Sequence, residues 1–218
     1  MGDKLILWGV GTKRTIRAHW ALHELDLPYE CRPIMSRSGE TKSAEFTALN
    51  VRQKIPLLED GDFRIGESAA IVAYLAENYA RPNHSLIPAG KSQQAKWLEW
   101  CFFIIAELDS TSLYVMRRHG KFAHIYGDAP AVVDQAAKYF RHQLRFVDAA
   151  LTDGRSYLMG EQFTTADIIL GTCLLWATED GVEIFDSTHA YLDRITVRPA
   201  YLRAATANLP RATAAAIR

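Results

Sequence analysis

The chain has few cysteines and no long hydrophobic run. Its 218 residues include three cysteines, Cys31, Cys101 and Cys173, and no CxxC pair. This usage indicates buried thiols in a reducing compartment, and it argues against a disulfide framework or a dithiol redox centre. The longest apolar stretches, 101–106 and 168–177, are shorter than the ~20 residues that a membrane span needs. The first residues also lack a secretion-signal pattern. We therefore expect a soluble, cytoplasmic protein without a membrane partner.

An excess of charge of one sign is missing too. Lys plus Arg and Asp plus Glu number 25 each, so the formal net charge is +0 at pH 7. Such a chain has no overall attraction for nucleic acid, and we expect no nucleic-acid partner. A metal site is not expected either. His19 and His23 are one helical turn apart but lack an obvious third ligand, and His119 and His124 are no better placed. A packed or surface histidine pair is the favoured interpretation.

What the chain does have, up to residue 80, is an alternation of strand and helix signals. The apolar run Leu5–Trp8 predicts a buried strand, apolar residues at helical spacing follow over 18–25, and 29–34 predicts a second strand. This βαβ order implies a parallel strand pair. Residues 44–49 predict a short helix. A hairpin is predicted over 56–65, where two short apolar runs flank the turn sequence EDGD.

The pattern changes after the helix that Gly66-Glu67-Ser68 opens. Proline, glycine and polar residues over 81–90 predict a linker, and no convincing strand follows it. Apolar periodicity instead predicts long helices over 97–108 and 133–151, with shorter helices near Tyr191 and after Pro199. The fold class is therefore an α/β N-terminal domain over 1–80 and an all-α domain over 91–218.

A central helix of the second domain has a clear start signal. Thr164 is followed three residues later by Asp167, in the manner of a capping box, and Phe163 and Ile168 are placed for a hydrophobic staple. The residues after this box are strongly apolar on one face. We expect a buried helix there.

Three segments together resemble the cytosolic glutathione transferase family. They are RAHWALHELDLPY over 17–29, KIPLLEDG over 54–61 with ESAAI over 67–71, and FTTAD over 163–167. The resemblance covers nearly the whole chain. It implies a thioredoxin-like first domain that binds glutathione, an all-helical substrate-binding second domain, and a homodimer. It also implies that the glutathione thiolate attacks a small hydrophobic electrophile.

Binding of glutathione is expected at the start of the helix that contains Glu67 and Ser68. A hydroxyl and backbone N–H groups at a helix N-terminus suit a carboxylate, and the helix dipole favours the anion. A plain helix cap is the other role open to Ser68. The resemblance implies that Ile55 pairs through its backbone with the cysteinyl part of glutathione beside a cis Ile55–Pro56 bond. A trans proline at a strand start is the alternative.

Cations for the glycine carboxylate of glutathione are implied at two lysines. Lys54 and Lys42 occupy positions where the family often has them, and Gln53 is a further candidate. A solvated surface charge is the alternative for each lysine.

The residue that activates the thiol is expected at Thr12. The Tyr-type classes have a tyrosine near the end of the first strand, where this chain reads LWG over 7–9, and no cysteine lies between Trp8 and Arg17. Counting back from the helix motif, Thr12 falls where the Ser-type classes have their serine. A hydroxyl donated to the thiolate contributes roughly 1.5–3 kcal/mol and lowers the thiol pKa by about one to two units. A helix-capping role for Thr12 and activation by Thr15 both stay open.

Other residues are given mainly structural roles. Arg17 is expected to pack its stem against the sheet. Residues 117–119 suit the C-terminus of a helix, although a cationic patch for an acidic electrophile is the alternative. Asp109 is either part of a structural ion pair or a contact to the partner subunit's glutathione.

Two further kinds of function remain open on the same scaffold. One is a different glutathione chemistry, such as peroxide or disulfide reduction, ether cleavage or isomerisation. The other is a non-catalytic glutathione-binding or regulatory protein, because a fold does not determine its chemistry.

Overall fold

The computed structural model describes residues 4–81 and 84–210 and divides into two compact units. The first unit comprises the chain up to His84 together with the chain from Arg198 onward, and the second comprises Ser85–Val197. The sequence-based division, by contrast, assigned everything after residue 90 to the helical domain. The last helix groups with the first unit because it packs against a helix of that unit.

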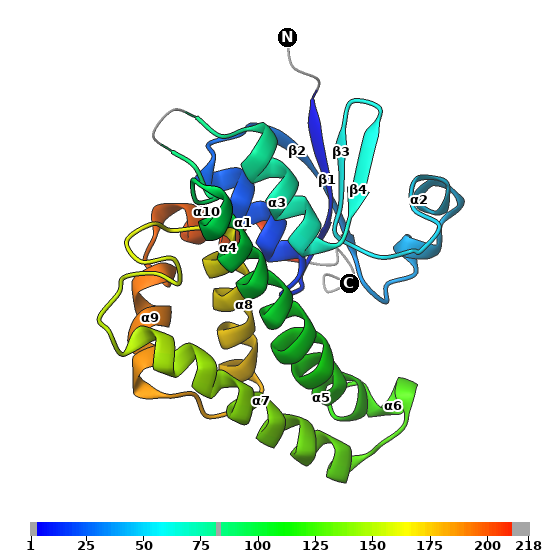
Figure 1. Ribbon diagram of the computed structural model, residues 1–218. Coiled ribbons are helices and arrows are strands. Elements are labelled where there is room, and N and C mark those ends of the chain that lie inside the picture. The colour runs from blue at the N-terminus through cyan, green and yellow to red at the C-terminus, as the bar shows by residue number, and fades with distance from the viewer. Residues whose placement is uncertain (1–3, 82–83, 211–218) are drawn as a thin grey trace. The chain divides into compact units, whose positions relative to one another are not determined.

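The first unit is built on a four-stranded mixed sheet (Figure 1). Its elements are β1 (Leu5–Val10), α1 (Thr15–Glu24), β2 (Tyr29–Met35), the 3-10 turn η1 (Glu40–Lys42), α2 (Ala44–Leu49), β3 (Leu57–Asp60), β4 (Phe63–Gly66), α3 (Ser68–Asn78) and α10 (Pro199–Ala207). The strand order is β2-β1-β3-β4. β1 and β2 are parallel, and β3 is antiparallel to β1 and to β4. The predicted βαβ unit and hairpin are therefore confirmed.

Trp8 packs inside this unit. Its ring lies 5.5 Å from the ring of Phe46 on α2, and both belong to a buried cluster with Leu57. Its indole Nε1 donates to Glu59 Oε1 at 2.6 Å. A large aromatic residue that satisfies its N–H in this way is a packing residue, and here it joins α2 to the sheet.

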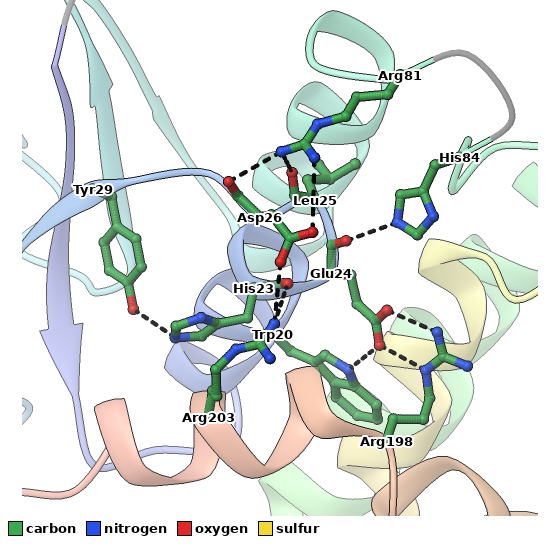
Figure 2. Close-up of polar contacts among 10 residues, drawn as sticks. All are labelled: Trp20, His23, Glu24, Leu25, Asp26, Tyr29, Arg81, His84, Arg198 and Arg203. Atoms are coloured by element: carbon green, nitrogen blue, oxygen red, sulfur yellow. Dashed lines mark hydrogen bonds and ion pairs between the residues drawn. The ribbon is translucent and has the colours of Figure 1, made fainter.

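Helix α10 is held against α1 by charged groups (Figure 2). Arg198 makes a bidentate contact with Glu24, with both N···O distances at 2.7 Å. The Glu24 side chain is only 4% exposed, and it also accepts from Trp20 Nε1 at 2.9 Å. Further along α10, Arg203 donates to the carbonyl of His23 at 3.0 Å. The chain therefore returns to the first unit at Arg198, and α10 completes that unit.

The second unit consists of helices in the part of it that the structure describes. They are α4 (Lys91–Phe103), the π-helical stretch η2 (Ile104–Leu113), α5 (Tyr114–His119), α6 (Ala123–Tyr126), α7 (Pro130–Leu151), α8 (Thr165–Glu179) and α9 (Asp186–Thr196). α4, η2 and α5 follow one another without a break, so the helix predicted over 97–108 is longer than expected. The spacing of apolar residues did not predict its π-helical part.

The structure contains no candidate for a transmembrane segment within residues 4–81 and 84–210, because no helix there is sufficiently long and apolar.

The predicted capping box begins α8, which is the most buried helix of the second unit. Asp167 is fully buried and accepts from Thr164 N at 2.7 Å and from Thr164 Oγ1 at 2.9 Å. Its carboxylate also accepts from Leu158 N at 2.9 Å and from the Tyr191 hydroxyl at 2.7 Å. Burial raises the pKa of Asp167, and these hydrogen bonds oppose that rise. Asp167 thus joins the start of α8 to the preceding loop and to α9.

Replacing this carboxylate should destabilise the protein strongly. Asp167→Ala leaves buried donors of Thr164, Leu158 and Tyr191 without an acceptor, and we expect a loss of about 3–5 kcal/mol in the free energy of unfolding. Urea unfolding followed by far-ultraviolet circular dichroism measures it. Asp193→Ala, at an exposed position of α9, is the matched control and should change the free energy by less than about 0.5 kcal/mol. Equal effects of the two variants would contradict the prediction.

Candidate functional site

The N-terminal turn of α1 is closed by two threonines. Thr12 Oγ1 accepts from Thr15 N at 3.0 Å, and Thr15 Oγ1 accepts from Thr12 N at 2.9 Å. Thr12 therefore fulfils the capping role that its sequence position allowed. The two residues differ in access, since Thr15 is completely buried whereas Thr12 is half-buried.

Several hydrogen-bond acceptors surround the hydroxyl of Thr15 in this turn. Thr15 Oγ1 lies 2.9 Å from Thr12 O, 2.7 Å from Asn208 Oδ1 and 3.0 Å from Thr12 Oγ1. A hydroxyl has one proton, so Thr15 can donate to one of these acceptors at a time. The Thr12 hydroxyl can donate its proton either to Thr15 Oγ1 or to a ligand.

The second part of the site lies at the start of α3. Glu67 is the capping residue, with φ 63°, and Ser68 is the first residue of the helix. Ser68 is buried, and Arg17 Nη1 donates to its Oγ at 3.2 Å. The first N–H groups of a helix lack intrahelical acceptors, and the dipole makes this end positive. Together with the guanidinium of Arg17, these groups suit a carboxylate.

Arg17 is a functional candidate that sequence reasoning missed. It was assigned a packing role, yet its side chain is fully buried and its charge lies beside Ser68, 51 positions away. A buried arginine on the core-facing side of a helix requires a partner, so its place among the apolar residues Ile16, Ala18 and Ala21 was the available signal.

The cis Ile55–Pro56 bond is present, in a loop that other side chains shape. Asn50 Nδ2 donates to Lys54 O at 2.9 Å, and Gln53 Nε2 donates to Thr47 Oγ1 at 3.1 Å. The carbonyl of Lys54 is therefore held in place just before Ile55.

A contact missed by sequence reasoning joins this loop to α3. Arg52 Nη2 and Glu67 Oε1 are 2.6 Å apart, and both side chains are 63% exposed. An exposed pair of this kind contributes little to stability. It nevertheless connects the loop that contains Ile55 with the residue that precedes Ser68.

The end of β1 brings two predicted residues together. Gly9 has φ +113°, and a Cβ atom there would lie 2.6 Å from Ile55 Cβ and 3.0 Å from Thr15 Cγ2. Ile55 and the start of α1 therefore meet over this glycine. The position accepts no side chain, in agreement with the absence of a tyrosine from this part of the strand.

The predicted lysines are less closely tied to the site. Lys42 is exposed at the end of η1, and Lys54 is exposed beside Ile55. No ion pair fixes either side chain within residues 4–81 and 84–210. Both remain predictions that rest on their positions in the sequence.

His19 and His23 pack around one tyrosine. His19 Nδ1 is 2.7 Å from the Tyr29 hydroxyl, which is 3.4 Å from His23 Nε2. The other ring nitrogen of His19 lies 3.2 Å from the carbonyl of Gly9. Burial lowers the pKa of His19 to about 4. His19 is thus a packed residue next to the strand end that borders Thr15. The described residues contain no group of three or more side chains arranged to hold a metal.

Two candidates lie in the second unit. Asp109 is buried within η2. At the end of α5, Arg117 lies over Phe122 at 4.9 Å and over Trp176 at 5.5 Å. Such stacking on aromatic faces, near a helix C-terminus, fits the structural role preferred for this arginine.

Comparisons with known proteins agree with this architecture. The family model for the N-terminal domain of glutathione S-transferases matches residues 3–77, and that for the C-terminal domain matches residues 130–204. Glutathione S-transferase 3 of Zea mays is 34% identical over 158 residues, which are 70% of this chain and 68% of that protein. Glutathione S-transferase 1 of Schizosaccharomyces pombe is 32% identical over 154 residues, which are 68% of this chain and 64% of that protein.

A solved structure is also similar over most of the chain. It is a glutathione transferase homologue of Drosophila mojavensis with bound glutathione, with a TM-score of 0.84 and 26% identity. The similarity covers 94% of this chain and 93% of the other. The fold is a thioredoxin-like α/β domain with an all-α domain. The chain belongs to the glutathione S-transferase family.

The burial of His19 predicts a pH-dependent stability. The folded pKa of about 4 lies below the unfolded value of 6.5, so the unfolded chain binds the extra proton between these values. The contribution of neutral His19 to the free energy of unfolding is fully present above pH 6.5. It falls by up to about 3 kcal/mol as the pH drops towards 4. Urea unfolding at stepped pH measures this slope.

His19→Gln should flatten the pH dependence in this window. His142→Gln, at an exposed position of α7, is the control and should keep the wild-type slope. The prediction fails if His19→Gln unfolds with the wild-type pH dependence.

Proposed function

We propose that this protein binds glutathione and activates its thiol for attack on a hydrophobic electrophile. The observation that carries the proposal is the contact between Ser68, at the start of α3, and the fully buried Arg17 of α1. A buried positive group beside a helix N-terminus is suited to one carboxylate of a small ligand. The bound glutathione in the Drosophila mojavensis homologue supports the choice of ligand.

Binding is divided among several residues of the first unit. Ser68 donates its hydroxyl to the γ-glutamyl carboxylate, Arg17 supplies charge behind it, and Glu67 receives the amino group. The backbone of Ile55 pairs with the cysteinyl part, while Lys54 and Lys42 serve the glycine carboxylate. The contact between Arg52 and Glu67 supports this division, because it connects the two segments that would hold opposite ends of one ligand.

Activation of the thiol is assigned to Thr12. Its exposure favours it over Thr15, which is completely buried. The N–H of Thr15 donates to Thr12 Oγ1, so the Thr12 hydroxyl can direct its proton towards a sulfur. A hydrogen bond to the thiolate stabilises the charged form, and the start of α1 adds a favourable dipole.

The reaction then follows from ordinary thiol chemistry. The thiol gives up its proton to solvent, and the thiolate forms a carbon–sulfur bond with the electrophile while the leaving group departs. Thr12 keeps its own proton and donates it as a hydrogen bond. Its part is to raise the population of the nucleophile at neutral pH.

Two further features belong to the proposal. A homodimer is supported by the exposed Phe102 and Leu98, which lie one turn apart on α4 with 69% and 42% exposure. A cytoplasmic location is supported by the cysteines, none of which forms a disulfide. Burial raises the pKa of Cys101 to about 12, so this thiol is not a competing nucleophile.

Removing the Thr12 hydroxyl should raise the thiol pKa of bound glutathione by about one to two units. The change is measured by titrating the ultraviolet thiolate absorbance of the complex, after calorimetry has shown binding. Thr12→Ser should keep the wild-type value, and Thr206→Ala, on the exposed side of α10, is the matched control. An unchanged pKa in Thr12→Ala would exclude Thr12 as the activator. Stable thioether formation with chlorodinitrobenzene distinguishes transfer from reduction, which yields oxidised glutathione.

Ser68→Ala should weaken glutathione binding by about ten-fold or more, because a charge-assisted hydrogen bond is lost. Calorimetric titration measures the dissociation constant. The thiol pKa of the complex should stay at its wild-type value, since Ser68 holds the carboxylate and not the sulfur. Ala69→Ser, one position further along α3, is the control. Wild-type affinity in Ser68→Ala would contradict the assigned carboxylate site.

A further inference from the structure

The residue that follows α10 contacts the turn that holds Thr12. Asn208 Oδ1 lies 2.7 Å from Thr15 Oγ1 and 3.2 Å from Gly11 N. The backbone carbonyl of Asn208 also accepts from Gly11 N at 2.9 Å, and Asn208 Nδ2 donates to Thr12 O at 3.3 Å. One asparagine therefore holds the backbone on both sides of Thr12, together with the side chain of Thr15.

These contacts fix the orientation of the Asn208 amide. Gly11 N is a donor and Thr12 O is an acceptor, so the oxygen of the amide faces Gly11 and its nitrogen faces Thr12. The amide oxygen can only accept. The Thr15 hydroxyl must therefore be the donor in its contact with Asn208. This contact, at 2.7 Å, is shorter than those of Thr15 Oγ1 with Thr12 O and Thr12 Oγ1.

This assignment determines how the threonine hydroxyls are shared. With its proton directed to Asn208, Thr15 Oγ1 accepts from Thr12 N at 2.9 Å and offers a lone pair to the Thr12 hydroxyl at 3.0 Å. Without Asn208, Thr15 would direct its proton to Thr12 O or Thr12 Oγ1 instead. Asn208 thus fixes the direction of the Thr15 proton and the position of the turn from which the Thr12 hydroxyl can donate to a thiolate.

The packing of α10 places Asn208 at this turn. Arg198, before α10, contacts Glu24 at the C-terminal end of α1, whereas Asn208, after α10, contacts Thr15 at the N-terminal end (Figure 2 shows the former). The two helices are therefore antiparallel, with the rings of Trp20 and Tyr201 4.8 Å apart between them.

The chain immediately after Asn208 remains close to the turn. Gly11 has φ +79°, and a Cβ atom there would lie 3.2 Å from Pro210 Cγ. Residue 11 must therefore be small for this segment to approach, and glycine also permits its backbone conformation.

We propose that Asn208 is a positioning residue for the activation of glutathione: it orients the Thr12 hydroxyl through Thr15 and through the backbone of Gly11 and Thr12. This inference rests on the proposed role of Thr12. It adds a residue 196 positions away in sequence to the machinery of the thiol.

The test compares Asn208→Ala with Arg203→Ala. Asn208→Ala removes the amide and retains the backbone contact to Gly11. Arg203→Ala removes a contact of the same helix with the other end of α1. Two quantities are measured: the thiol pKa of bound glutathione, and the hydrogen-exchange rates of the Thr12 and Thr15 amides without ligand. Binding of S-methylglutathione, which has no ionisable thiol, reports affinity alone.

For Asn208→Ala we expect the thiol pKa to rise by about half a unit to one unit. At a pH below the thiol pKa, kcat with chlorodinitrobenzene should fall about three- to ten-fold. The two amides should exchange faster, and S-methylglutathione should bind as in wild type. Arg203→Ala should lower Tm and change neither the thiol pKa nor the exchange of these amides.

Two results would overturn the inference. One is wild-type exchange and thiol pKa in Asn208→Ala. The other is an equal rise of the thiol pKa in Arg203→Ala, which would assign the effect to helix packing in general. A wild-type complex without a thiolate signal would instead overturn the proposed function, and it would be recognised before any variant is made.

Discussion

Glu24 and Arg198 place opposite charges at the boundary between α1 and α10, where the glutamate is almost completely buried. A buried charge is tolerated only with a partner, and removal of one member leaves the other uncompensated. This ion pair therefore fixes which end of α10 faces which end of α1. The orientation of α10 in turn brings Asn208 to the other end of α1, where it contacts the turn at Thr12 and Thr15.

The candidate site is consequently arranged around one helix. The turn before α1 presents Thr12, the first turn of the helix supplies Arg17 to Ser68, and the end of the preceding strand allows Ile55 to approach. Each of these contacts uses a different kind of interaction: a hydroxyl cap, a buried charge and a close backbone approach. A ligand that spans these points interacts with a rigid element of the fold, which favours its precise placement.

Local signals were sufficient for much of the fold. The parallel strand pair, the hairpin and the capping box at Thr164 and Asp167 were predicted and are present. These features depend on neighbouring residues, on helical or strand periodicity, or on a short motif. The cis Ile55–Pro56 bond is also present, but it was implied by the family resemblance, and the residues alone left a trans proline open.

The missed contacts depend on distant parts of the chain. Arg17 and Ser68 are 51 positions apart, and Thr12 and Asn208 are 196 apart. Periodicity reports which side of a helix is buried but does not identify what covers it. For the same reason the sequence left the choice between Thr12 and Thr15 open, because both lie in one turn and differ only in which distant residues pack over them.

The course of the backbone also affects how this protein can change. His84, where the chain leaves the first unit, bonds to the carbonyl of Glu24, and Arg198, where it returns, bonds to the carboxylate of the same residue (Figure 2). The helical unit is thus connected as an insertion whose two junctions meet at one point. Insertions with adjacent ends can be exchanged or lengthened with little disturbance of the host domain. The helical part of this protein is accordingly able to diverge while the sheet and the turn at Thr12 stay unchanged.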